Sequence, residues 1–464
     1  MSDTQKTTMT DIVALAKRRG FVFPGSEIYG GLANTYDFGP LGVELLKNIL
    51  DIWWKTFVTQ RADMYGLDTS ILMSPKVWEA SGHTDSFTDA LIDCKSCQTR
   101  TRADHLIENF TEKQGKIETV EGKTPEELTK IIDSLEINCP VCGKKDWTEV
   151  RSFNLLFETN IGIVEDSQSL AYLRGEIAQG MFVNFKNVLN TMRPKLPFGI
   201  AQSGKAFRNE ITKGNFVFRT LEFNLAEFEY FFDSEKQDSD ELFETWKVIM
   251  QEFAESLGLS KEKLRWRTHT DEERSHYSTK TEDIDYEFPF GFKEMFGLSY
   301  RTDYDLRNHM EKSGVDLKYT DPYDNKRKFI PHVIEPTFGI NRIFLAILAE
   351  SYTKDEKRTH LKLPAKLAPY KVAVFPLVKN KPELVDKAQE IFQSLQKITT
   401  ATWDDRGNIG KRYMAQDEIG TPFCLTVDYE SLEDGTVTLR DRDTTEQVRL
   451  SLSEVEERIK NMLS

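Results

Sequence analysis

Charged side chains interrupt two neighbouring segments that otherwise read as β-strands. AFRNEI, at residues 206–211, carries Arg208 and Glu210, and FRTLEF, at residues 218–223, carries Arg219 and Glu222. A charge in a half-buried strand costs free energy unless it is paired or used. The pattern leaves two interpretations open, namely ion pairs across the strands or a bound charged ligand.

The residues after the second segment show the same conflict. Leu221, Phe223 and Leu225 share one strand face with Glu227 and Glu229, because side chains alternate along a strand. The apolar phase therefore breaks between Leu225 and Glu227. Such a break indicates either a β-bulge or a face that passes from the core into a cleft.

Two later segments repeat this combination of charged and apolar residues. KEMFG, at 293–297, carries Glu294, and EPTFGINR, at 335–342, carries Glu335 and Arg342. Arginines placed around a polyphosphate, with carboxylates that hold Mg²⁺ or an ammonium group, suit nucleotidyl transfer. That chemistry requires positioning and charge stabilisation more than covalent participation.

Four of the five cysteines form two Cys-x-x-Cys pairs, Cys94 with Cys97 and Cys139 with Cys142. In a reducing compartment this pattern favours one tetrahedral Zn²⁺ over disulfides, and the alternative is four unrelated thiols. Four thiolates leave no open position, so we expect a structural zinc at the base of an insertion. Cys424 reads as a buried residue of a strand.

Size and charge restrict the remaining possibilities. A chain of 464 residues with 39% hydrophobic residues predicts two or three globular domains. A net charge of −14 argues against a grip on nucleic acid along the whole chain, although not against a local basic surface. We expect a cytoplasmic protein with no membrane segment, because no signal-peptide pattern or bilayer-length apolar run is present.

The quoted segments resemble the three motifs of class II aminoacyl-tRNA synthetases. AFRNEI and FRTLEF resemble motif 2, EPTFGINR resembles motif 3, and a predicted helix at 43–60, with Trp53 and Trp54, resembles motif 1. Further segments are similar to the homodimeric glycyl-tRNA synthetases over nearly the whole chain: FVFPGSEIYGG, YDFGPLG, LMSPKVWEASGH, RADHL, AQGMFVNF, LPFGIAQ, RTDYDL and QDEIGTPFC.

The resemblance implies an α+β fold in which helices flank an antiparallel sheet. Residues 1–93 and 151–352 would form the catalytic domain and residues 94–150 an insertion with the Cys₄ zinc site. Residues 353–366 would be a linker, and residues 367–464 an α/β anticodon-binding domain. There Lys411, Arg412 and Arg440 are candidates for contacting tRNA.

The implied activity is glycine–tRNA ligation by a homodimer. Glycine and ATP, with Mg²⁺, would yield glycyl-adenylate and pyrophosphate, and tRNA(Gly) would then accept the glycyl group with release of AMP. The alternative is a non-catalytic, synthetase-like protein that binds nucleic acid or acts as an accessory subunit. Such a protein should lose the ATP-binding Arg–Glu combination, which this chain keeps.

The resemblance also assigns ATP-binding residues. Arg208 would bind the α-phosphate, Arg342 the γ-phosphate and Glu294 the ATP–Mg²⁺ unit, while Phe223 would stack on adenine and Glu210 would contact adenine or its framework. Arg208, Glu210 and Arg342 would be catalytic. The remaining residues of the implied ATP site are Asn209, Phe218, Arg219, Met295 and Gly339, with Arg301 as a further candidate.

Glycine would be recognised through its ammonium group. Glu176, Glu227 and Glu335 would surround that group, and Thr337 would line the pocket. Arg102, Phe223 and Gly339 complete the implied glycine site. A tight pocket would reject larger amino acids by overpacking.

Several positions depart from the family pattern. Leu221 stands where motif 2 usually has a second Arg, Leu225 where bacterial members usually have Gln, and Gly175 where Pro is usual. Leu221 removes a cation from the implied site, for which Arg219 is the nearest replacement. Thr337 replaces a Ser and keeps the hydroxyl.

Overall fold

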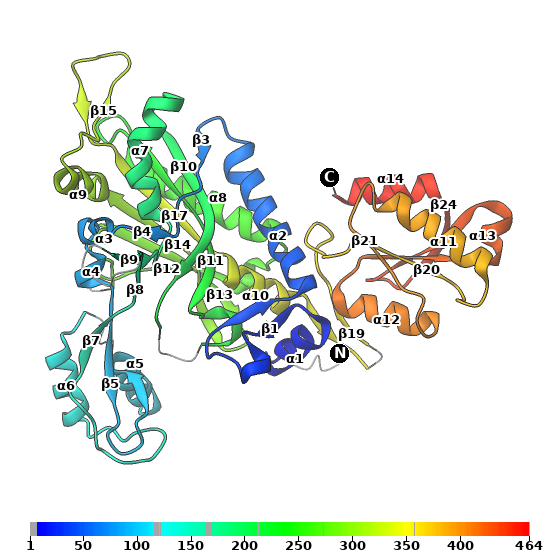
Figure 1. Cartoon of the computed structure of the whole chain (residues 1–464), viewed down its shortest axis with the longest axis horizontal. Helices are drawn as coiled ribbons and strands as arrows, with labels where there is room; N and C mark the ends of the chain where they lie inside the picture. The colour runs from blue at the N-terminus through cyan, green and yellow to red at the C-terminus, as the bar shows by residue number, and fades with distance from the viewer. Residues whose placement is uncertain are drawn as a thin grey trace.

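A computed structural model describes residues 7–115, 120, 122–162, 169–210, 214–271, 273–356 and 358–463. Within these residues a central sheet carries two appended bodies, an insertion near the start of the chain and a domain at its C-terminal end (Figure 1). None of the helices in these ranges has the length and apolarity that crossing a bilayer requires.

The central sheet has seven strands in the order β12-β13-β14-β17-β11-β10-β3. All neighbours pair antiparallel except β10 and β3, which pair parallel. The predicted antiparallel sheet is therefore confirmed. The strands are β3 (Met64–Gly66), β10 (Phe198–Phe207), β11 (Glu222–Phe232), β12 (Leu264–Thr268), β13 (Lys280–Phe288), β14 (Gly291–Thr302) and β17 (His332–Gly339).

One face of this sheet forms the main hydrophobic core. Phe228 of β11 contacts Trp53 and Trp246, which lie on helices of this face. Trp53 is fully buried and packs in this core. The helices of this face are α1 (Met9–Arg19), α2 (Pro40–Trp54) with a π-helical extension at Lys55–Thr59, α8 (Ser239–Ser256) and α10 (Ile340–Ser351).

The opposite face holds a second core at one end and charged residues further along. Phe231 of β11 packs on Phe185 of α7 (Ala178–Met192), with α9 (Tyr304–Ser313) beside it. Glu227 and Glu229 share this face with Phe231. The β10–β11 and β11–β17 registers run without a shift along this stretch, so the face passes from core into a cleft and β11 has no bulge there.

Short elements frame this face and the N-terminal edge. They are β1 (Val22–Pro24), η1 (Glu27–Tyr29), β2 (Tyr36–Phe38), β4 (Leu72–Met73), α3 (Pro75–Ala80), α4 (His83–Ser86), β8 (Phe157–Asn160), β9 (Leu170–Leu173), η3 (Phe216–Phe218), η4 (Lys261–Lys263), β15 (Tyr319–Thr320) and β16 (Lys328–Phe329).

The insertion is a separate lobe with its own small core (Figure 1). Its sheet has the order β6-β5-β7 and begins at Thr88, six residues before Cys94. Ile92, Ile107 and Ile132 are buried between this sheet and two helices. The elements are β5 (Thr88–Asp93), β6 (Arg100–Arg102), α5 (Ala103–Lys113), α6 (Pro125–Ser134) and β7 (Arg151–Asn154).

The described residues of the segment predicted as a linker, 353–356 and 358–366, are folded. β18 (Tyr352–Lys354) and β19 (Thr359–Leu361) form a hairpin, and Leu361 and Leu363 join the main core. The apolar positions of this polar stretch pack it against the main core, which explains why it is more ordered than its composition suggests.

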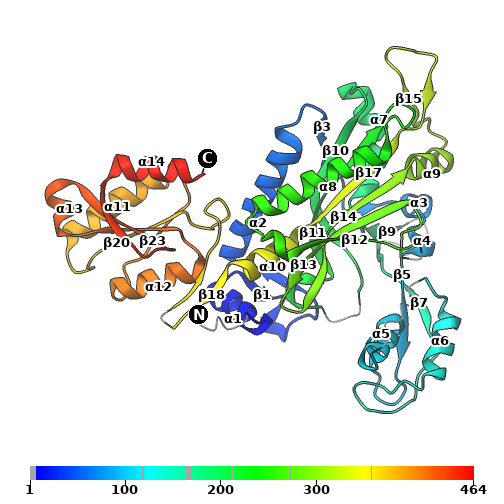
Figure 2. The ribbon, with the colours of Figure 1, turned by 180° about the vertical axis from the view of Figure 1, so that it is seen from behind.

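The C-terminal domain stands beside the central body (Figure 2). Its five-stranded sheet has the order β21-β20-β22-β23-β24. The first three strands pair parallel and the last two antiparallel, in agreement with the predicted α/β domain. Its elements are β20 (Val372–Pro376), α11 (Pro382–Leu395), β21 (Ala401–Trp403), α12 (Ile409–Ile419), β22 (Phe423–Val427), α13 (Tyr429–Asp434), β23 (Thr436–Asp441), β24 (Gln447–Ser451) and α14 (Leu452–Leu463).

Candidate functional site

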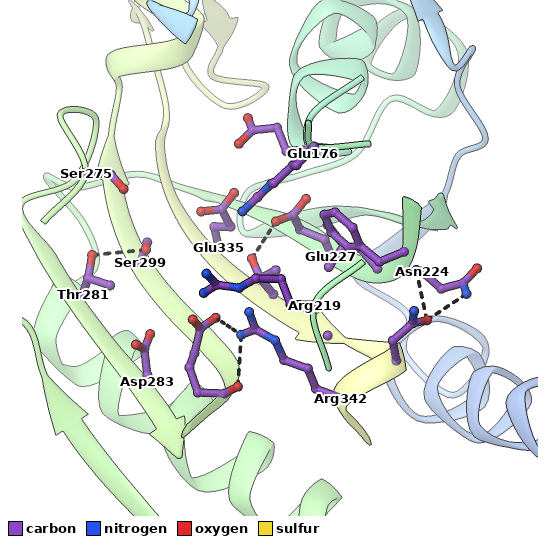
Figure 3. A pocket seen from close by; sticks show the side chains of 18 of the residues that line it. Glu176, Arg219, Asn224, Glu227, Ser275, Thr281, Asp283, Ser299, Glu335 and Arg342 are labelled. Atoms are coloured by element: carbon purple, nitrogen blue, oxygen red, sulfur yellow. Dashed lines mark hydrogen bonds and ion pairs between the residues drawn. The ribbon is translucent and has the colours of Figure 1, made fainter. Parts of the chain in front are cut away.

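A cleft of about 240 Å³ lies over the charged face of the central sheet. Glu176, Glu227 and Glu335 lie at one end of it, and Arg219 and Arg342 at the other (Figure 3). Its walls are formed by Glu176, Arg208, Glu210, Phe218, Arg219, Thr220, Phe223, Asn224, Leu225, Glu227, His269, Ser275, Tyr277, Thr281, Asp283, Glu294, Gly297, Ser299, Glu335, Thr337, Gly339, Asn341 and Arg342.

Arg208 follows directly after β10 and is held from two sides. Its Nε donates to the carbonyl oxygen of Gly175 at 3.0 Å. Its guanidinium carbon lies 5.3 Å from the ring centre of Phe223 and 5.1 Å from that of Phe87. A guanidinium held between aromatic rings keeps its orientation while other N–H groups remain available to a ligand.

Two ion pairs frame the same end of the cleft. Arg342 Nη1 lies 2.9 Å from Glu294 Oε1 and also donates to the Glu294 carbonyl oxygen at 3.0 Å. Arg219 Nε lies 3.0 Å from Glu210 Oε2. The charges of the opening segments are thus partly paired with each other, and they also face a space large enough for a ligand.

The other end of the cleft is an acidic pit built by Glu176, Glu227, Glu229 and Glu335, all between 0% and 7% exposed. Thr337 Oγ1 donates to Glu227 at 2.6 Å, and Arg301 Nη1 donates to Glu335 at 2.6 Å. Glu229 lies behind the wall, and neither of its carboxylate oxygens has a hydrogen-bond partner among the described residues.

The four carboxyls of the pit differ in their protonation. Burial opposes ionisation of Glu176, but His83 at 3.1 Å and Arg301 lower the pKa of Glu176 below its ordinary value. Burial, together with repulsion from Glu335, raises the pKa of both Glu227 and Glu229 well above the ordinary value. Burial raises the pKa of Glu335 to about 7, against the opposing effect of Arg301. A cationic ligand in the pit would favour the ionised carboxyls and displace protons from them.

Most of the predicted site residues line this cleft. The described cleft walls lack four of them: Asn209, Met295, Arg102 and the further candidate Arg301. Asn209 N donates to Leu155 O at 2.8 Å, and Met295 is buried in the main core. Arg102 lies in the insertion, where it pairs with Asp89 at 2.8 Å. Arg301 is buried behind the pit, between Glu335 and Asp305.

The sequence patterns missed residues that come from β13 and from the loop between β12 and β13. His269 Nε2 lies 2.7 Å from Asp283 Oδ2, and burial, with the charge of Glu294 adding to it, raises the pKa of Asp283 to about 6. Ser275 and Tyr277 complete this wall. The signal was the strand-like run KTEDIDYEF, whose acidic residues interrupt apolar ones as they do in motif 2.

The four paired cysteines converge at the end of β5 away from Thr88, where the insertion lobe begins, so the cluster does not lie at the base of the insertion as predicted. Cys94 and Cys142 sulfurs lie 3.6 Å apart, and those of Cys97 and Cys139 lie 3.7 Å apart. All four sulfurs lie within 4.8 Å of one another. Sulfurs bound to Zn²⁺ at about 2.3 Å in a tetrahedron are separated by about 3.8 Å, so this set fits one zinc ion.

Two of the three residues suggested for tRNA contact are structural instead. Arg412 is 2% exposed and donates to backbone carbonyls, including that of Pro376 at 2.6 Å. Arg440 is 7% exposed and pairs with Asp417 at 2.8 Å. Lys411 is exposed. The packing of α12 against the sheet turns the two arginines inward.

Comparisons with known families divide the chain into three matched regions. A tRNA synthetase class II core domain (G, H, P, S and T) matches residues 163–352. A glycyl-tRNA synthetase insertion domain 1 matches residues 117–155, and an anticodon binding domain matches residues 371–462.

Curated relatives match over almost their whole lengths. A glycine–tRNA ligase of Caldanaerobacter subterraneus subsp. tengcongensis is 51% identical over 462 residues, 99% of each chain. One of Geobacillus thermodenitrificans is 53% identical over 460 residues, 98% of this chain and 97% of that one. A crystal structure of prolyl-tRNA synthetase from Cryptosporidium parvum is similar in fold, with a TM-score of 0.65, 15% identity, and coverage of 100% of this chain and 77% of that one.

Proposed function

Because this chain belongs to the glycine–tRNA ligase family of class II aminoacyl-tRNA synthetases, we propose that its cleft performs both steps of glycine–tRNA ligation. A glycine carboxylate oxygen attacks the α-phosphorus of ATP. The bond to the bridging oxygen breaks, and its electron pair leaves with pyrophosphate. A hydroxyl of the terminal adenosine of tRNA(Gly) then attacks the carbonyl carbon of the adenylate and loses its proton to solvent. The bond from that carbon to the phosphate oxygen breaks, and AMP leaves with its electron pair.

The acidic pit beside a cluster of arginines is the observation that carries this proposal. Glu176, Glu227 and Glu335 bind the ammonium group, and Thr337 orients Glu227. Glycine has no side chain to recognise, so a buried acidic pit that fits closely around Cα would select it by excluding larger amino acids.

In this proposal the end of the cleft opposite the acidic pit binds ATP. Arg208 binds the α-phosphate and stabilises the charge that develops on it, while Phe223 stacks on adenine and Glu210 contacts the adenine or its framework. Arg342 binds the γ-phosphate, and Phe218, Arg219 and Gly339 complete this end. Glu294 offers the carboxylate oxygen that Mg²⁺ prefers, and the ion would neutralise phosphate charge during transfer.

Three finer assignments are also proposals. We propose that residues 1–93 and 151–352 form the catalytic domain, apart from the strands β5 and β7, which join residues 94–150 in the insertion lobe, and that residues 367–464 bind the tRNA anticodon. We propose one structural Zn²⁺ on Cys94, Cys97, Cys139 and Cys142, supported by the fit of the four sulfurs.

We propose further that the protein is a homodimer. Two observations support a partner at the β3 edge. This short strand ends the central sheet, and the nearby Ile71 and Leu72 are 38% and 47% exposed. Uncovered sheet edges with apolar neighbours are usually covered in the assembled protein. Light scattering on the eluted peak of a sizing column tests this, and a mass of one chain would contradict it.

The decisive experiment is exchange of labelled pyrophosphate into ATP with glycine, alanine or serine added. We expect exchange with glycine alone, followed by charging of tRNA(Gly). No exchange with any of the three, in folded protein, would instead favour the non-catalytic synthetase-like alternative. The intact combination of Arg208, Glu294 and Arg342 in one cleft favours the enzyme.

A further inference from the structure

A second pocket, of about 310 Å³, opens directly beside the nucleotide end of the cleft, and we call it the side pocket. It shares Phe218, Arg219, Glu294 and Arg342 with the cleft. The γ-phosphate of ATP, which Arg342 would bind, would therefore lie at the entrance of the side pocket.

Positive charge dominates the wall of the side pocket. Arg265, Arg267 and Lys293 add to Arg219 and Arg342, against the two carboxylates Asp285 and Glu294. The whole chain carries a net charge of −14, so five cations on one pocket wall are a local concentration of positive charge, in which Arg219 and Arg267 are also paired with Glu210 and Asp283. Such a pocket attracts an anion that carries several charges.

The added cations are oriented by the fold. Arg265 donates from Nε and Nη2 to Asp285 at 3.1 and 2.9 Å, and its guanidinium carbon lies 4.2 Å from the Phe292 ring centre. Arg267 donates to Asp283 at 2.6 Å. Each guanidinium keeps further N–H donors that can bind phosphate oxygens. Lys293 is exposed and has no ion pair within the described part of the chain.

We propose that the side pocket is a departure site for pyrophosphate, which moves there after the bond to the α-phosphate breaks. This inference rests on the proposed adenylation reaction. Pyrophosphate left at Arg342 would recombine with the adenylate, whereas transfer to a neighbouring cationic pocket separates it from the reacting phosphorus without exposing the adenylate to water.

Steady-state kinetics of ATP–pyrophosphate exchange tests this with Lys293→Met, which removes the charge but keeps the stem, and with Lys293→Glu, which reverses it. We expect the KM for pyrophosphate to rise about fivefold in the first variant and about tenfold or more in the second, while the KM for ATP changes less than about twofold. Lys261→Glu is the matched control, since Lys261 is exposed on η4 just before β12 and outside the side pocket.

Three outcomes would overturn the inference. They are an unchanged KM for pyrophosphate, an equal rise in the KM values for ATP and pyrophosphate, and a rise only in the KM for tRNA when charging is measured with the same variants. The last would assign the pocket to the phosphates of the tRNA end. If the unaltered protein shows no glycine-dependent exchange, the proposed function fails first, which separates the two failures.

Discussion

Thr337 Oγ1 donates a hydrogen bond to Glu227 Oε1 at 2.6 Å across the β11–β17 pair, where the two residues are direct register partners. The other oxygen of Glu227 has no hydrogen-bond partner among the described residues. The hydroxyl thus fixes the carboxyl plane and leaves one buried oxygen for a ligand.

Loss of this hydroxyl should weaken glycine binding. We expect Thr337→Val to raise the KM for glycine about tenfold, because a buried acceptor loses its donor. Thr337→Ser keeps the hydroxyl and should stay within about threefold of the unaltered protein. The measurement is glycine-dependent exchange at saturating ATP. Equal KM values in Thr337→Val and the unaltered protein would refute the orienting role.

The acidic pit should make glycine binding depend on pH. Burial raises the pKa of Glu335 to about 7 and raises those of Glu227 and Glu229 as well. An ammonium group favours the ionised carboxyls, so binding releases protons at lower pH. The KM for glycine should therefore fall between about pH 6 and about pH 8, by up to about tenfold per pH unit. A flat profile at constant ionic strength would contradict this.

The raised pKa of Glu335 also makes the folding stability of the free protein depend on pH. A carboxyl whose pKa is raised by folding binds more protons in the folded than in the unfolded state. Its stabilising contribution is fully present below the unfolded value of about 4.3. That contribution is lost as pH rises through about 7 for Glu335, and saturating glycine should reduce the loss. Thermal unfolding with and without glycine measures this.

Removal of the Arg208 guanidinium should abolish adenylation while the fold remains. We expect Arg208→Ala to lower the exchange rate about 10²- to 10³-fold, as loss of a donor to a developing charge does elsewhere. Arg307→Ala is the control, because Arg307 is exposed on α9 and outside the cleft. Circular dichroism should show both variants folded. Normal exchange by Arg208→Ala would exclude the phosphate role.

An arginine at position 221 should restore a cation that motif 2 usually has. The Leu221 carbonyl oxygen accepts from Arg208 N at 2.9 Å, so this position adjoins the arginine that we assign to the α-phosphate. We expect Leu221→Arg to raise the exchange rate about threefold to tenfold. A clear loss of rate would show that Arg219 and its neighbours are arranged in a way that requires Leu at position 221.

Each chain should contain about one zinc ion, in accord with a tetrahedral four-thiolate site. The Cys97→Ser variant should not bind this zinc, and its insertion should unfold at a lower temperature. The free energy of metal binding at such sites contributes to folding. Cys424→Ala should keep the metal, since Cys424 is buried in the other domain. Elemental analysis of the purified protein measures its zinc content. Zinc-free protein whose insertion is fully stable would contradict the assignment.

Part of this fold and site follows from local patterns. The alternation of apolar residues places Glu227 and Glu229 on one face of a strand, and the spacing of the cysteines predicts a single metal cluster. The motifs around Arg208, Glu294 and Arg342 predict the family and the antiparallel sheet. These are properties of residues close in the chain, for which strand periodicity and short turns determine the geometry.

Other features depended on which segments the tertiary structure brings together. The alternation of apolar and polar residues does not reveal that Arg412 and Arg440 point inward. Nor does it reveal that Met295 faces the core or that Asp283 joins the cleft. Burial and pairing come from neighbours distant in sequence, as when His83 and Arg301 lower the pKa of Glu176. The sequence therefore determined which chemical groups are present. The packing of β11, β14 and β17 decided which of them share one cleft, because a charge acquires its protonation and its partners only from the groups around it.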